Sequence, residues 1–393
     1  MKKAGNVLKK FFKWLFIVLG LVLLLANVFI LVTGRFYLYR AVGYTYLVGQ
    51  SGPGIHDKDY FHSREIAHAQ PEPWPYHKEF GKVNLSGEEL KELEKYKTTS
   101  FLVFHKDSLL LEHYFEDFTP ETVSNSFSMA KSVVSIAVGI AIAEGKIKSV
   151  NQPVSDFIPA YKEGKRSELT IFHLLTMSAA LDWNESGGNP LSHNAEAYYG
   201  TDLEQMILDC EVSGEPGKIF NYQSGATMIL GYVVEKATGM KLSKYIEEKI
   251  WKKIGAENTA FWSLDHENGT EKAYCCMYST GRDFARFGKL YMHNGNWNGN
   301  QIVPEEWVKT SLTPAPLMDE DGKPNERYGY CWWMVKHRDM PCFYMRGILG
   351  QYVICIPEKE LIIVRTGHKR GEKRGDQPLD IFTYMNIAER LIE

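Results

Sequence analysis

The sequence predicts an α+β protein in which one antiparallel sheet is closed by the two ends of the folded body, a mostly helical region is inserted between them, and one transmembrane helix comes first. Strand-like patterns occur in residues 101–115 and again in residues 328–367. Helical spacing dominates residues 150–310. A long apolar run lies near the N-terminus. Because strands stand on both sides of the helical region, both ends of the body are expected to share one sheet.

The N-terminal segment, residues 1–34, is expected to be a membrane anchor. Trp14–Val32 is an apolar run broken only by Asn27, and as a helix it would span about 28 Å, close to the hydrocarbon thickness of a bilayer. A cleaved signal peptide is the alternative, but it would normally have a shorter apolar core followed by small residues. Lysines precede the run and should stay cytoplasmic, at positions Lys2, Lys3, Lys9, Lys10 and Lys13. The sequence therefore favours a single-pass protein whose folded body is extracytoplasmic, either periplasmic or at the cell surface.

Composition excludes some classes of function. The chain has 44% hydrophobic and 24% charged residues, enough for a substantial core, and a net charge of −3 gives no electrostatic case for binding nucleic acid. Neither the six cysteines nor the histidines at 56, 62, 68 and 77 show the spacing of a metal site. No metal and no organic cofactor is expected. Disulfide connectivity cannot be deduced from spacing, although Cys355, in the apolar run QYVICI, is expected to be a buried free thiol.

Residues 35–80 are expected to form an extended juxtamembrane lead-in, because three prolines fall between Pro71 and Pro75. The folded body is expected to cover residues 81–393. It should begin with a hairpin, strands 101–104 and 109–115 joined by a turn at 106–108. The last elements expected are strands in 328–335, 351–356 and 361–367, and a helix over 379–392.

The stretch NSFSMAKSVVSIAVGIAIAEGKI, residues 125–147, is expected to form a buried central helix that ends at Gly145. Its apolar residues lie on all sides of the helix, which is typical of a core helix. Lys131 lies in the apolar first turn, three residues after Ser128, so the two side chains should share one face. A buried ammonium group is costly unless something compensates.

The pair Ser128 and Lys131 can perform nucleophilic catalysis. A serine hydroxyl is a weak nucleophile until a base takes its proton. Burial and the positive end of the helix dipole both lower the pKa of a lysine, so a neutral amine could act as that base. The same helix terminus offers the backbone N–H of Ser128 to a developing oxyanion. Ser-x-x-Lys alone is expected about once by chance in such a chain, and a capping serine beside an outward-pointing lysine is the alternative.

Two further segments strengthen the catalytic interpretation. Tyr222-Gln223-Ser224 stands where a loop passes into a helix, and a tyrosine near a cation can relay protons to a leaving group. Gly347 and Gly350 bracket Ile348-Leu349 just before a strand, where glycine lets a backbone N–H approach a ligand closely. A packing aromatic and a plain β-bulge are the respective alternatives.

Together, in this order and spacing, these segments resemble the serine hydrolases of the β-lactamase/penicillin-recognising superfamily, class C branch, from Tyr96 to the C-terminus. LTIFHLLTMSAALDWNE and IPEKELIIVRTG also resemble segments of that family. The family's Tyr-x-Asn is Tyr222-Gln223-Ser224 here, and the chain has no Lys-Thr-Gly. Tyr-x-Ser with Gly-Ile-x-Gly-Gln looks instead like the 6-aminohexanoate-dimer hydrolases and related esterases. MSAAL departs from the family's Ser-Gly at Ala179 and Ala180, so that turn is expected to differ.

The resemblance implies roles for particular residues. Ser128 would be the nucleophile, Lys131 its base and Tyr222 the acid/base partner. The N–H groups of Ser128 and Ile348 would form the oxyanion hole, and Ser224 would support Lys131 or the substrate. Gly347 and Gly350 would shape the adjoining binding strand. Tyr198 and Tyr199 are candidates for contact with substrate, with core packing as the alternative.

The resulting hypothesis is a membrane-anchored serine hydrolase that cleaves a small-molecule amide or ester through an acyl-enzyme on Ser128. The absence of the Lys-Thr-Gly lysine argues against recognition of the β-lactam carboxylate. A β-lactamase or D,D-peptidase, in which Arg346 binds the carboxylate of the substrate, is one alternative. A penicillin-type sensor that acylates without turnover is the other. The sequence leaves the substrate and the oligomeric state open.

Overall fold

A computed structural model describes residues 2–393, with side chains from Asn6 onward. Its main sheet is antiparallel and has the strand order β11-β12-β13-β14-β2-β3. Strand β14 pairs with β2, with Ile363 opposite Val103, so the C-terminal strands join the N-terminal hairpin in one sheet, as the sequence predicts. The strands are β2 (Thr98–His105), β3 (Ser108–Tyr114), β11 (Trp333–His337), β12 (Met340–Gly347), β13 (Gln351–Ile356) and β14 (Leu361–Gly367).

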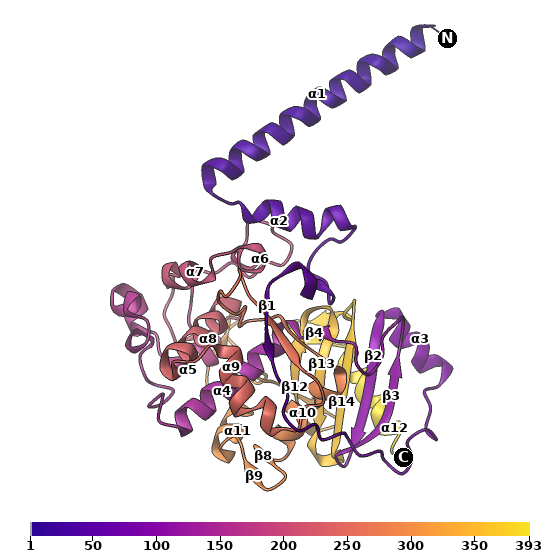
Figure 1. The fold of residues 1–393 in the computed structure, drawn as a ribbon, viewed down its shortest axis with the longest axis vertical. Helices are drawn as coiled ribbons and strands as arrows, with labels where there is room; N and C mark the ends of the chain where they lie inside the picture. Colours follow the sequence, from indigo (N-terminus) through magenta and orange to yellow (C-terminus); the bar gives the residue numbers. More distant parts are fainter. Residues whose placement is uncertain (1) are drawn as a thin grey trace.

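Helices cover both faces of this sheet (Figure 1). Helix α10 (Gly281–Met292) packs so closely on one face that a Cβ at Gly288 would lie 3.0 Å from the Cys355 sulfur. On the other face the Tyr352 hydroxyl donates to Asp380 at the start of α12 (Asp380–Arg390), 3.2 Å away. Helix α3 (Gly87–Lys95) also contacts β2. Both faces of β13 are therefore buried, which explains why QYVICI is apolar without alternation.

The inserted region lies beside the sheet and packs on α4 (Ala130–Ala143), the helix that precedes it in the chain. The residues of α4 are buried on all sides up to Ala141. Gly145, at φ +69°, follows the end of this helix, as the sequence predicts. The helices of the region, besides α10, are α5 (Ile171–Leu175), α6 (His193–Tyr199), α7 (Leu203–Asp209), α8 (Ser224–Thr238), α9 (Leu242–Lys249) and α11 (Glu305–Ser311).

A second antiparallel sheet, with the order β1-β6-β7-β4, supports the start of the central helix. Its strands are β1 (Ser63–Ile66), β4 (Ser124–Asn125), β6 (Ala260–Ser263) and β7 (Met277–Ser279). The pairing of β4 with β7 fixes the chain immediately before Ser128. Shorter strand pairs join β5 (Ile219–Phe220) to β10 (Met318–Asp319), β8 (Asn296–Trp297) to β9 (Asn300–Gln301), and β15 (Lys373–Arg374) to β16 (Gln377–Pro378).

The segment 35–80 contains regular structure that packs on the body. It forms α2 (Tyr37–Tyr44), a short turn η1 (Tyr46–Val48), a second turn η2 (Asp57–Tyr60) and β1, which pairs with β6. Ile55 and Ile66 are fully buried, so their apolar side chains hold the segment against the body. Residues 50–54 and 67–75, the latter including the prolines, have no helix or strand. The sequence-based expectation of an extended lead-in over the whole of 35–80 is therefore wrong where α2, η2 and β1 form, because their apolar side chains find partners on the body.

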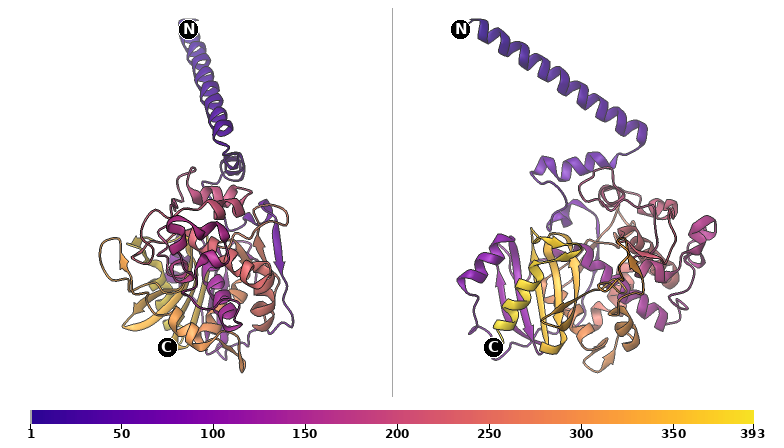
Figure 2. Two further views of the ribbon diagram at one scale, coloured as in Figure 1. Left: turned by 90° about the vertical axis from the view of Figure 1, so that its left-hand side faces the viewer. Right: turned by 180° about the vertical axis from the view of Figure 1, so that it is seen from behind.

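Helix α1 (Lys2–Thr33) projects away from the body, and α2 lies between the two (Figures 1 and 2). Within it Asn6–Thr33 is long and apolar enough to cross a membrane, and its most apolar 18-residue stretch has a mean hydropathy of 3.1. This composition suits a retained anchor and a signal sequence alike. The side chains of α1 are apolar on all sides of the helix, and most of them are exposed because the body does not cover them.

Candidate active site

Ser128 and Lys131 lie together at the head of the central helix. Ser128 is the middle residue of the turn η3 (Phe127–Met129), and Lys131 lies in the first turn of α4. The Lys131 Nζ is 3.1 Å from the Ser128 Oγ. Lys131 is 1% exposed, whereas Ser128 is half-buried at the wall of a cavity. The serine hydroxyl is therefore accessible to a ligand while the amine is not.

The Lys131 amine is held by two further oxygen atoms. Its Nζ donates to the Ser224 Oγ at 3.1 Å and to the backbone carbonyl of Tyr274 at 2.8 Å. Burial lowers the pKa of Lys131 to about 8, with the Glu185 carboxylate opposing this shift and the Arg346 guanidinium adding to it. A substantial fraction of the amine is therefore neutral at mildly alkaline pH.

Tyr222 completes the group around the amine. The centre of its ring lies 5.1 Å from Lys131 Nζ and 5.8 Å from the Arg346 guanidinium carbon. Burial raises the pKa of Tyr222, and Arg346 and a hydrogen bond with Ser128 only partly offset this. The phenol is consequently protonated near neutral pH and can act as a proton donor.

Glu185 is a site residue that the sequence analysis missed. Its carboxylate accepts from both the backbone N–H and the hydroxyl of Ser224, each at 2.7 Å, and from the Trp183 indole N–H at 3.0 Å. Because Ser224 donates its single hydroxyl proton to Glu185, its oxygen is left to accept from Lys131. An isolated glutamate in a loop gives no sequence signal, so only the fold reveals this contact.

The glycine-bracketed turn closes the other side of the site. A Cβ at Gly347 would lie 2.3 Å from the Ser126 carbonyl oxygen, so only glycine lets the end of β12 approach the Ser128 turn this closely. Ile348 lines the cavity and is 42% exposed. Gly350 instead lies behind the turn, where a Cβ would be 2.3 Å from Arg365.

Arg365 is a second residue without a sequence signal. It is fully buried and donates to the carbonyl oxygens of Leu349 and Gly350, at 3.0 and 2.8 Å. Leu349 has a φ of +61°, a conformation unfavourable for a residue with a side chain. The arginine thus holds a strained turn beside Ile348 in one shape.

A cavity of about 930 Å³ opens over these residues. Its floor contains Ser128, Tyr222, Ser224 and Ile348, and Arg346 stands in its wall. The sequence candidates Tyr198 and Tyr199 line it too, but they are only 4% and 5% exposed, and the Tyr198 hydroxyl donates to Asp57 at 2.8 Å. Core packing therefore accounts for most of the surface of both tyrosines.

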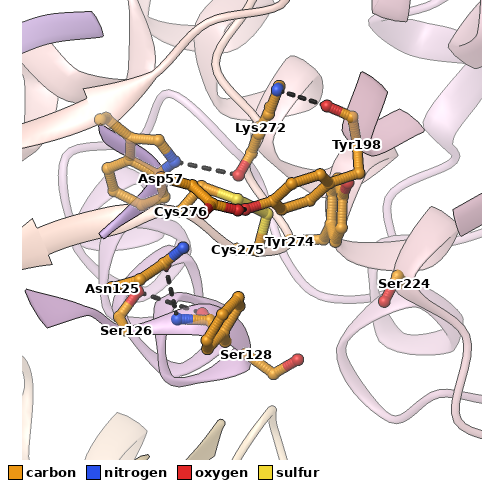
Figure 3. The surroundings of a disulfide bond; sticks show 12 residues. Asp57, Asn125, Ser126, Ser128, Tyr198, Ser224, Lys272, Tyr274, Cys275 and Cys276 are labelled. Atoms are coloured by element: carbon orange, nitrogen blue, oxygen red, sulfur yellow. Dashed lines mark hydrogen bonds between the residues drawn. A yellow bond between two sulfur atoms is a disulfide. The ribbon is translucent and has the colours of Figure 1, made fainter. Parts of the chain in front are cut away.

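A disulfide joins the adjacent residues Cys275 and Cys276 beside the site (Figure 3). Just before it, the Tyr274 carbonyl accepts from Lys131, and just after it, the Met277 carbonyl accepts from the Ser126 N–H at 2.7 Å. The disulfide therefore lies between two backbone carbonyls that support the serine–lysine pair. The other cysteines are buried free thiols, including Cys355 as predicted from the sequence.

The fold, with a Ser-x-x-Lys turn at the head of its central helix, is that of the penicillin-recognising serine hydrolases. Residues 88–382 match the family described as Beta-lactamase, and the chain belongs to this family. It is 27% identical to the 6-aminohexanoate-dimer hydrolase of Paenarthrobacter ureafaciens over 290 residues, 70% of this chain and 73% of that protein. It is 28% identical to Esterase EstB of Burkholderia gladioli over 160 residues, 37% of this chain and 40% of that protein.

A similar solved structure is that of a Bacillus anthracis protein provisionally assigned as a 6-aminohexanoate-dimer hydrolase. The TM-score is 0.72 at 22% identity, over 86% of this chain and 92% of that chain. The likeness establishes the β-lactamase-like α+β fold that the sequence predicts.

Proposed function

We propose that this protein is a membrane-anchored serine hydrolase that cleaves an ester or amide bond through an acyl-enzyme on Ser128. The observation that carries the proposal is the 3.1 Å contact between the Ser128 hydroxyl and the buried Lys131 amine. The hydrolase relatives named above support the general reaction. The transmembrane anchor is proposed from the length and hydropathy of α1, and the lysines before its apolar run favour a cytoplasmic N-terminus.

In this mechanism the neutral Lys131 amine takes the Ser128 proton as the oxygen attacks the substrate carbonyl. The backbone N–H groups of Ser128 and Ile348 stabilise the oxyanion. Tyr222, as a neutral phenol, protonates the leaving alcohol or amine. The phenolate that remains then takes a proton from the Lys131 ammonium. Water then attacks the acyl-enzyme by the same proton transfers in reverse and releases the acid.

The proposal is tested with a substrate panel on the purified full chain: p-nitrophenyl esters, 6-aminohexanoate amides and a chromogenic cephalosporin. Hydrolysis of esters or linear amides is expected. An initial burst of p-nitrophenol is expected with the activated esters, whose acylation step is faster than hydrolysis of the acyl-enzyme. If no substrate in the panel is turned over, and the cephalosporin gives only a single burst of product, the protein is a sensor instead.

A carboxypeptidase or β-lactamase is the second candidate, and Arg346 is the observation that favours it. Its guanidinium carbon lies 3.4 Å from the centre of the Trp333 ring, in the wall of the cavity. Its guanidinium donates to the backbone carbonyl of Asp376, and none of the ion pairs among the described residues involves Arg346. An arginine fixed in this way could bind a substrate carboxylate. Preference for the cephalosporin over the esters would favour this candidate.

Glu185 and Arg346 are expected to shift the pH profile in opposite directions. The Glu185 carboxylate favours the Lys131 ammonium, so Glu185→Gln should lower the pH at which activity rises. Arg346 disfavours the ammonium, so Arg346→Gln should raise that pH. Glu185→Gln should also lower the maximal rate about tenfold, since one charged hydrogen bond to Ser224 is lost. Profiles of kcat/KM against pH measure both shifts, and identical midpoints in the two variants would contradict this account.

Reduction of the Cys275–Cys276 disulfide is expected to lower kcat/KM by roughly ten- to a hundredfold, because a displacement of about 1 Å at a catalytic group costs this much. A water-soluble phosphine supplies the two electrons, and mass spectrometry reports the two thiols formed. The double variant Cys275→Ser/Cys276→Ser is the control, which should be slow and unaffected by the phosphine. Full activity after complete reduction would show that the disulfide does not position the site.

A further inference from the structure

The wall of the active-site cavity is built in part from residues that directly follow the proposed membrane anchor. Only Gly34, Arg35 and Phe36 separate α1 from α2. Helix α2 has eight residues and is about 12 Å long. The cavity lining includes Ala41 and Thr45 of this segment, followed by Tyr46 and residues 51–53. The cavity mouth is therefore tied to the end of α1 by a short, structured connection.

The same segment exposes apolar side chains that the body leaves uncovered. Val42 is 45% exposed, Tyr46 70% and Leu47 79%. The inner face of α2 is occupied, with the Tyr37 hydroxyl donating to the Pro190 carbonyl at 3.1 Å. We call the exposed group the juxtamembrane patch; it consists of Phe36, Tyr39, Val42, Tyr46, Leu47, Val48 and Leu191.

The juxtamembrane patch continues the apolar surface of α1. The Tyr39 hydroxyl donates to the Asn27 side-chain oxygen of α1 at 2.7 Å, so the exposed face of α2 is turned toward that helix. Residues 34–56 contain no aspartate or glutamate, and four tyrosines stand between positions 37 and 46. Tyrosine-rich segments without acidic residues are typical of the membrane–water interface.

Basic side chains from a different part of the chain border the same cavity. Arg370 lines it from the loop that follows β14, and Lys373 and Arg374 line it from the short strand β15. Burial, together with the charges of Arg370 and Arg346, lowers the pKa of Lys373, and Asp376 opposes this shift. The cavity lining also includes the carboxylates of Asp319, Glu320, Asp321 and Asp376. Two of these, Asp319 and Asp376, are paired with Arg327. A basic rim next to an apolar patch complements anionic lipid headgroups above an acyl layer.

We propose that the juxtamembrane patch rests in the membrane interface, so that the cavity opens onto the lipid surface and takes amphiphilic acyl esters or amides from it. This rests on the proposed hydrolase function and on α1 as a retained anchor. An acyl chain would enter past Tyr46 and an anionic headgroup would lie against the Arg370 and Lys373 rim. The scissile carbonyl would then lie over Ser128, because all of these residues border one cavity.

The first test locates the patch and needs no activity. The full chain is reconstituted in vesicles containing phosphatidylglycerol, with an environment-sensitive fluorophore on Leu47→Cys. Glu306→Cys, exposed on α11 at the end of the body far from α2 (Figure 1), is the matched control. The probe at position 47 is expected to be quenched by spin-labelled lipids, and the probe at position 306 to be unaffected. If spin-labelled lipids quench neither probe and both probes emit as they do in water, the proposal is overturned.

The second test measures substrate preference in the same vesicles. Leu47→Ser/Val48→Ser should raise KM for a vesicle-borne p-nitrophenyl dodecanoate about tenfold, the effect of losing two apolar contacts. Hydrolysis of soluble p-nitrophenyl acetate should be unchanged, because neither residue lines the cavity.

The outcomes separate the two proposals. Lipid quenching at position 47 without hydrolysis of either ester would mean that the hydrolase function fails while the membrane contact holds. A blue shift at position 47 that depends on protein concentration, without lipid quenching, would mean that a second copy covers the patch, and it would overturn the lipid proposal. Equal KM values for dodecanoate in the variant and the parent protein would overturn entry from the membrane.

Discussion

Ser128→Ala is expected to abolish covalent labelling by a fluorophosphonate and to reduce ester hydrolysis by about 10⁴-fold or more, the cost of removing a catalytic serine. The hydroxyl is the only part of Ser128 that can form the acyl bond, and it borders the cavity beside the Lys131 amine. Alanine leaves the backbone N–H in place. Labelling followed by intact-protein mass spectrometry measures the effect.

The control for this variant is Ser132→Ala, one turn further along the same helix. The Ser132 hydroxyl is buried and donates to the Cys331 carbonyl at 2.7 Å, away from the cavity. This variant should lose some stability, about 1 kcal/mol for one buried hydrogen bond, yet label at the normal rate. Normal labelling of Ser128→Ala would place the nucleophile elsewhere.

Lys131→Met is expected to lower the rate of acylation by about 10²–10⁴-fold, the usual contribution of a general base. Methionine fills the buried space without the desolvation cost of an ammonium group. The melting temperature should therefore stay the same or rise while activity falls. This combination separates a catalytic role from a structural one, since a structural lysine would lower both quantities when removed.

Lys131→Arg is the matched control for charge. Arginine remains protonated at every accessible pH, so it keeps the positive charge and cannot take a proton. The arginine variant should be as inactive as Lys131→Met. Activity close to that of the parent protein would show that Lys131 acts as a fixed charge rather than as a base. Circular dichroism checks that each variant is folded.

The central part of the site could be predicted from the sequence because it is local. Ser128 and Lys131 are three residues apart in a helix whose apolar pattern predicts burial, and the fold brings Tyr222 and Ser224 to the same amine. Strands β2, β3, β13 and β14 could be predicted for the same reason, since their apolar patterns are continuous or alternate regularly.

Contacts between distant segments could not be predicted. Glu185 meets Ser224 across 39 positions, and Arg365 reaches Leu349 from the neighbouring strand. Neither residue belongs to a pattern, because its partner is determined by tertiary packing. Strand β12 was not expected either: MPCFYMRG includes a proline and an arginine, and its pairing with β13 outweighs this weak local signal.

The central claim is that a neutral Lys131 amine removes the proton of Ser128. Its most direct test is the rate of inactivation by a fluorophosphonate, measured against pH on the full chain. Because burial lowers the pKa of Lys131 to about 8, the ammonium dominates below that pH and the neutral base above it, so the rate should rise with pH through about 8 and then level off. A rate that is flat from mildly acidic to alkaline pH would contradict the claim.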